Sequence, residues 1–98
     1  MIVQLKGTKS YLITYELESY DETYPAIAEY LRSCPNWARV GAHTWFVRTR
    51  TTAGYLRDEL KKLLKNEEDQ VMVVQTTDAE WATYAVSKEV TDWMKDNV

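Results

Sequence analysis

The chain has 98 residues, 45% of them hydrophobic and 28% charged, which is the composition of one soluble globular domain over residues 1–98. No apolar run approaches the length of a membrane span, so we expect no membrane contact, and the net charge of −3 argues against a dedicated nucleic-acid binder. The single cysteine, Cys34, excludes an internal disulfide and argues against a cysteine-based zinc site, and the first residues lack a signal-peptide layout, so we expect a cytoplasmic protein.

The first predicted element is a strand over residues 11–18, preceded by an extension of residues 1–9. Six of the strand's first seven residues are aromatic, aliphatic or β-branched, a composition typical of a strand with one buried face. Glu16 and Glu18 lie two residues apart near its carboxyl end, so their side chains share a face. They form either a ligand site beyond the strand end or a solvated acidic surface.

A helix and a pair of strands follow. Apolar residues at helical spacing predict a helix over residues 24–33, which ends before Pro35. Residues 37–40 and 44–50 are rich in aromatic and β-branched side chains, and they predict two strands joined tightly around Gly41.

The remaining chain predicts a second helix, a fourth strand and a helical tail. Thr51 or Thr52 caps the second helix, which carries a stripe of leucines. A polar turn leads to a strand over residues 70–76, and a helical tail follows over residues 78–98, with Ser87 as a second cap within it. The leucine stripe consists of Leu56, Leu60, Leu63 and Leu64.

This order of elements predicts an α+β fold of the ferredoxin-like βαββαβ type. We expect an antiparallel four-stranded sheet, two helices on one of its faces and an extra C-terminal helix. The first and third strands are expected side by side at the centre of the sheet, running parallel to each other.

Period-two alternation divides these two central strands between the faces of the sheet. On the face away from the helices, Leu12 and Phe46 form an apolar pair. Glu16 and Arg48 form an acid-base pair beside it, so we expect a second copy to cover this face. The expected dimer interface consists of Leu12, Thr14, Phe46 and Arg48. The face toward the helices is expected to receive Tyr11, Ile13, Tyr15, Leu17, Trp45 and Val47.

Charge is distributed unevenly along the chain. Residues 32–65 hold eight basic and two acidic residues, a net charge of +6, between residues 1–31 at −3 and residues 66–98 at −6. The basic block is either a phosphate-facing patch or a region that attracts another part of the domain or a second subunit. The candidate nucleic-acid-binding residues are Arg39, Arg48 and Arg50.

His43 is the only histidine, so any histidine-based catalytic constellation has to use it. It is either a general acid or base in RNA cleavage or an ordinary surface histidine in the strand hairpin.

Several segments resemble those of small SinR-like bacterial proteins, which are similar to dimeric CRISPR-associated nuclease-fold proteins of spacer acquisition and to VapD-type ribonuclease toxins. The segments are Tyr-Leu-Ile-Thr-Tyr-Glu-Leu at residues 11–17, His-Thr-Trp-Phe-Val-Arg-Thr at 43–49, the strand at 71–74 and the tryptophan-containing tail at 81–95. The resemblance covers roughly residues 10–97. It implies a dimeric ferredoxin-like fold.

The resemblance also implies a role for Glu16. First strands of the CRISPR-associated relatives end in Tyr-Asp, and that aspartate from each of two subunits is proposed to hold a divalent metal. The matching pair here is Tyr15-Glu16, which makes Glu16 the candidate metal ligand and catalytic residue, with Mg²⁺ as the implied ion.

The function we expect is that of a cytoplasmic homodimer with a structural or regulatory role, weak or absent catalysis and no cofactor. One alternative is a magnesium-dependent endonuclease, acting on RNA or DNA through Glu16 of both subunits, whose activity Glu16→Ala abolishes. The other is a protein-interaction module of a toxin-antitoxin type system, in which an exposed strand edge pairs with a partner chain.

Overall fold

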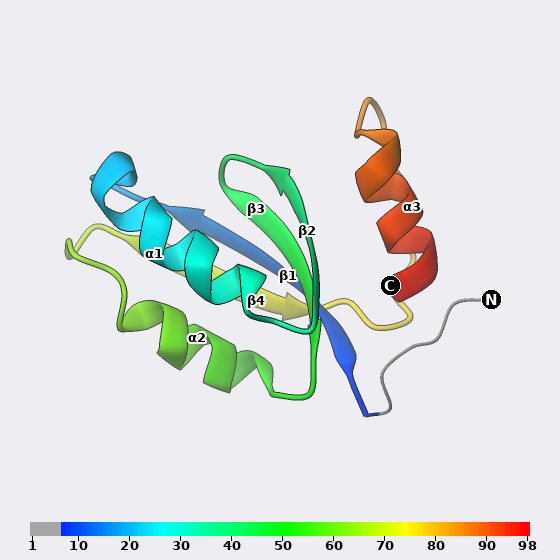
Figure 1. Cartoon of the computed structure of the whole chain (residues 1–98), viewed down its shortest axis with the longest axis horizontal. Coiled ribbons are helices and arrows are strands. Elements are labelled where there is room, and N and C mark those ends of the chain that lie inside the picture. The colour runs from blue at the N-terminus through cyan, green and yellow to red at the C-terminus, as the bar shows by residue number, and fades with distance from the viewer. Residues whose placement is uncertain (1–6) are drawn as a thin grey trace.

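The computed structural model describes residues 7–98, so most of the predicted extension at residues 1–9 lies outside the described residues. Figure 1 shows the strands side by side with helices against them, and the last helix of the chain lying apart from the other helices. In chain order the elements are β1 (Lys9–Glu16), α1 (Tyr20–Arg32), β2 (Asn36–Gly41), β3 (Thr44–Thr49), α2 (Ala53–Lys61), β4 (Gln70–Gln75) and α3 (Lys88–Asn97).

The strands form one antiparallel sheet in the order β2-β3-β1-β4, which confirms the predicted α+β class and the four-stranded antiparallel sheet. The central pair β1 and β3 is adjacent as expected, but its predicted parallel direction is wrong. Leu12 lies opposite Phe46 and Ile13 opposite Trp45 in an antiparallel register. The α1 crossover returns β2 in the direction of β1, and the tight β2–β3 turn then reverses the chain.

The predicted alternation of side chains in the two central strands is confirmed. The strands contribute Tyr11, Ile13, Tyr15, Trp45 and Val47 to the main core, and Leu17 packs at its margin. From the helices come Ile27, Ala28, Leu31, Leu56 and Leu60. The apolar stripes of α1 and α2 therefore cover one face of the sheet, as the helical spacing predicts.

The third helix packs on the opposite face. Phe46 of β3 is buried with Val90 and Met94 of α3, and Trp93 stacks on Phe46 with their ring centroids 5.7 Å apart. Since Phe46 alternates with Trp45 and its neighbours in the main core, this second cluster lies on the far side of the sheet. The far face is thus covered in part by the chain itself.

Several element boundaries differ from the prediction, and strand β1 spans Lys9–Glu16 rather than residues 11–18. Helix α1 begins at Tyr20 rather than at residue 24, and Pro25 lies inside it, where it lacks the N–H that would bond the carbonyl of Asp21. The tail is helical only from Lys88. Asp78 and Ala85 have positive φ angles of 60° and 59°, which an α-helix does not accommodate.

Ser87 caps α3 as predicted, since its hydroxyl accepts a hydrogen bond from the N–H of Val90 at 3.2 Å. Within residues 7–98, no helix combines the length and the apolar character needed to cross a membrane.

Candidate functional site

Arg48 is buried within the chain, with 7% of its surface exposed. Its Nε donates to the Thr8 hydroxyl at 2.8 Å and its Nη2 to the Thr8 carbonyl at 3.2 Å. A third hydrogen bond runs from Nη1 to the backbone carbonyl of Asn97, at the carboxyl end of α3, where a helix favours a cation. Arg48 therefore joins the start of β1 to the end of α3.

The predicted pairing of Glu16 with Arg48 is wrong. In the antiparallel register Arg48 lies opposite Ser10, six residues before Glu16 on β1. At the rise of a strand this separation is about 20 Å, far beyond the reach of an ion pair. On the other side of β1, Glu16 lies opposite Gln70 of β4.

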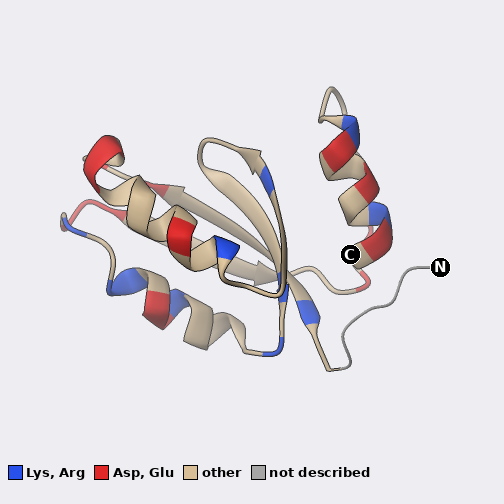
Figure 2. Ribbon diagram, in the orientation of Figure 1, with Lys and Arg blue, Asp and Glu red and all other residues tan. Residues whose placement is uncertain are grey.

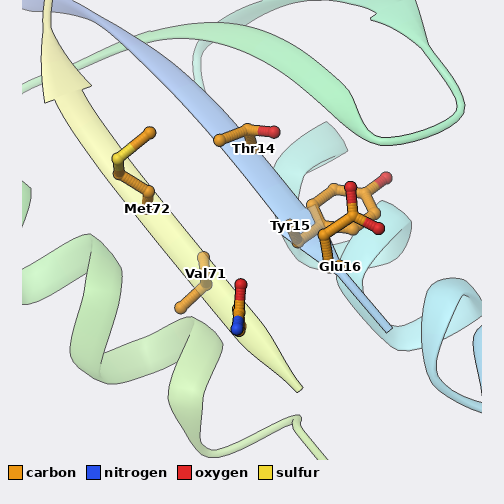
Figure 3. A pocket seen from close by; sticks show the side chains of 6 residues that line it. Thr14, Tyr15, Glu16, Val71 and Met72 are labelled. Atoms are coloured by element: carbon orange, nitrogen blue, oxygen red, sulfur yellow. The ribbon is translucent and has the colours of Figure 1, made fainter. Parts of the chain in front are cut away.

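Glu16 is exposed and borders a shallow pocket of about 410 Å³ between β1 and β4. Figure 3 shows the side chains around this pocket. Among residues 7–98, no group of three or more His, Cys, Asp or Glu side chains is arranged to hold a metal ion. The role of Glu16 as a metal ligand or catalytic residue stays a prediction. The pocket is lined by Thr14, Tyr15, Glu16, Gln70, Val71 and Met72.

The three candidate nucleic-acid-binding arginines do not meet at one place. Arg39 lies opposite Trp45 near the β2–β3 turn, whereas Arg48 is held under α3 and Arg50 is exposed just beyond β3. Figure 2 shows basic residues spread over the end of α1, the sheet and α2, where they are Arg57 and Lys61. The basic block of the sequence is therefore divided over several surfaces.

A cluster of aromatic side chains around the β2–β3 turn was missed in the sequence. The Ala42 carbonyl accepts hydrogen bonds from the hydroxyls of Tyr15 and Tyr20, both at 2.9 Å. Tyr20 stacks on Tyr24 with a centroid distance of 4.9 Å, and the exposed ring of His43 lies edge-on to Tyr20 at 5.2 Å. The i, i+4 spacing of Tyr20 and Tyr24 could have indicated this cluster.

Arg39 completes the cluster from β2. Its Nη2 donates to the Tyr20 hydroxyl at 3.2 Å, its Nε donates to the Gly41 carbonyl at 3.1 Å, and its guanidinium lies 4.8 Å from the centroid of the Tyr24 ring. These contacts fasten the turn to α1 and use part of the hydrogen-bonding capacity of Arg39.

Tyr15 makes the fold sensitive to alkaline pH. Burial raises the pKa of its phenol to about 12, against an opposing contribution from the Trp45 Nε1, which donates to it at 3.0 Å. The folded chain then holds this proton more tightly than the unfolded chain. The contribution of this group to the free energy of unfolding is fully present below about pH 10. It falls by about 2 kcal/mol as the pH rises toward 12. Denaturant unfolding across this range should show a weaker pH dependence for Tyr15→Phe than for the wild type; equal dependence would contradict the assignment.

An apolar strip remains uncovered on the far face of the sheet. Leu12 lies opposite Val74, and Thr14 opposite Met72, where β1 pairs with β4. Met72 is 55% exposed and Val74 43% exposed, and Leu12 and Thr14 are half-buried. We call these four residues the β1–β4 strip.

The expected dimer interface is thereby divided. Phe46 and Arg48 lie under α3 of the same chain, and Leu12 packs at the margin of the Phe46 cluster. Thr14 belongs to the uncovered part of the face, with Met72 and the pocket beside Glu16.

Comparison with models of known families, with curated proteins and with solved structures gives no match to this chain.

Proposed function

We propose that this chain is a cytoplasmic homodimeric interaction domain with a structural or regulatory role, and that the β1–β4 strip is its dimer interface. The carrying observation is the exposure of Met72 and Val74 beside Leu12, on the sheet face where α3 packs on Phe46. Burying such a strip removes apolar surface from water, the main favourable term in association.

The fold assignment belongs to the same proposal. We assign the domain to the ferredoxin-like βαββαβ class, and the strand order β2-β3-β1-β4 with β1 and β3 at the centre supports it. In this class a helix layer covers one face of the sheet, so the second face needs a cover. Here α3 supplies part of that cover, and a second copy supplies the rest.

A second copy suits the strip because the strip can complement itself. Its side chains carry no charge, so two strips facing each other across a two-fold axis bring no like charges together. The acidic Glu16 lies at one end, beside the pocket, where it forms part of a polar rim.

The dimer is tested by measuring mass in solution with light scattering after gel filtration. The wild type is expected to be a dimer, and Val74→Glu a monomer, because each copy would then place a carboxylate in the apolar centre. Tyr55→Glu changes an exposed residue of α2 in the same way and should remain dimeric. A monomeric wild type, or equal behaviour of the two variants, would overturn the proposal.

A further inference from the structure

The outer edge of β4 is an unprotected strand edge. Among residues 7–98, strand β4 pairs only with β1, and it lies at the end of the sheet order. Its sequence, Gln-Val-Met-Val-Val-Gln, contains no charge, proline or glycine. Natural edge strands usually carry such residues to prevent pairing with other chains. Strand β4 therefore has the composition of a strand that accepts a neighbour.

The register indicates which backbone groups face outward. The Thr76 N–H donates to the Ser10 carbonyl at 2.8 Å, so Thr76 points its backbone toward β1. Backbone direction alternates along an antiparallel strand, so Val74 and Met72 also point toward β1. Val71, Val73 and Gln75 then direct their N–H and C=O groups away from the sheet. These groups are the hydrogen-bonding positions for an added strand.

Two shallow grooves run beside this edge on the helix side. One, of about 620 Å³, includes Arg57, Lys61 and Lys65, and the other, of about 250 Å³, also includes Arg57. Both reach Val71 of β4. An added strand would place every second side chain over these grooves.

The first groove also contains the acidic residues Glu67 and Asp69, and backbone N–H groups already bind the carboxylate of Asp69. The Asp69 carboxylate accepts hydrogen bonds from the backbone N–H groups of Glu18, Lys65 and Asn66 at 2.8 to 3.1 Å. These bonds hold the pKa of Asp69 below its usual range. Arg57 is paired with the Asp58 carboxylate at 2.8 Å, which leaves Lys61 and Lys65 as the basic side chains that face Glu67 in this groove.

We propose that the β4 edge binds an extended segment of another protein in which acidic side chains alternate with apolar ones. The segment adds a fifth strand through the outward backbone groups of Val71 and Val73. Its acidic side chains lie over the larger groove beside Lys61 and Lys65, and its apolar side chains extend the β1–β4 strip beyond Met72 and Val74.

A second copy fits this edge poorly. Helix α2 packs beside β4, so two β4 edges paired about a two-fold axis would bring Lys61 of one copy toward Lys61 of the other. The inference goes beyond the proposed dimer, which uses the face of the sheet and not its edge.

The test uses a fluorescent peptide of alternating glutamate and valine as the probe, with a lysine-valine peptide as the charge control. Anisotropy titrations at low salt should show binding of the glutamate peptide only. Lys61→Glu should weaken binding by at least about tenfold, whereas Lys62→Glu, which changes the neighbouring residue outside both grooves, should leave it nearly unchanged.

Amide hydrogen exchange locates the added strand. The N–H groups of Val71 and Val73 should exchange more slowly with the peptide bound, and Gln75→Pro, which removes a neighbouring outward N–H, should weaken binding. No binding, equal binding of both peptides, equal effects of the two lysine variants or protection elsewhere would each overturn the inference. The mass of the protein in the same samples reports the dimer separately.

Discussion

Replacing Arg48 with methionine is expected to lower the free energy of unfolding by about 3 kcal/mol and to release α3 from the sheet. Methionine fills much of the same volume but donates no hydrogen bonds. The Thr8 hydroxyl and the carbonyls of Thr8 and Asn97 would lose their donor in a place that water reaches poorly. The cost arises from these lost hydrogen bonds more than from the lost charge.

Arg50→Met is the matched control, because Arg50 is exposed two residues further along the chain. Surface changes of this kind usually alter stability by less than about 0.5 kcal/mol. Urea unfolding measures both variants, and amide exchange within Lys88–Asn97 reports whether α3 has detached. Equal stability of the two variants, with α3 still protected, would show that Arg48 does not fasten the helix.

Replacing Trp45 with alanine is expected to cost about 3–5 kcal/mol of unfolding free energy. Trp45 is fully buried in the main core, and its indole N–H donates to the Tyr15 hydroxyl at 3.0 Å. The change would leave a large cavity and remove a donor from a buried phenol. A loss of this size takes up a large part of the stability of a small domain.

Trp37→Ala provides the comparison for this prediction. Trp37 lies beside Trp45 with a ring distance of 5.4 Å, but it is 39% exposed at the edge strand β2. Its removal leaves a site that water can fill, so the loss should be well below that for Trp45. Thermal and urea unfolding of both variants decide the order, and a larger loss for Trp37 would contradict the assignment of the core.

Much of the fold was predictable because its signals are local. Alternation in residues 11–18 placed Ile13 and Tyr15 toward the helices and Leu12 away from them, and burial confirms each of these positions. The Ser87 cap was also correct, since it depends on one hydroxyl and the helix that follows.

The candidate site was less predictable because it depends on register. Glu16 and Arg48 both lie on the far face of the sheet, as alternation predicted, yet the antiparallel register places them at opposite ends of their strands. The residue pattern of one strand does not specify the register in which the neighbouring strand pairs with it. The predicted helix over residues 78–87 is wrong for a related reason. The chain there bends at Asp78 and Ala85, which have positive φ angles, and α3 then packs on Phe46.

Residue order therefore determined the number and type of the elements and the face to which each strand residue belongs, because periodicity acts within a few residues of the chain. Tertiary structure decided the direction of β3 against β1, the burial of Arg48 by α3 and the exposure of the β1–β4 strip. These features arise where segments distant in sequence compete for the same surface of the sheet. The strip is exposed because α3 packs on Phe46 rather than on Met72 and Val74, and β4 is an edge strand because it ends the sheet order among the described residues.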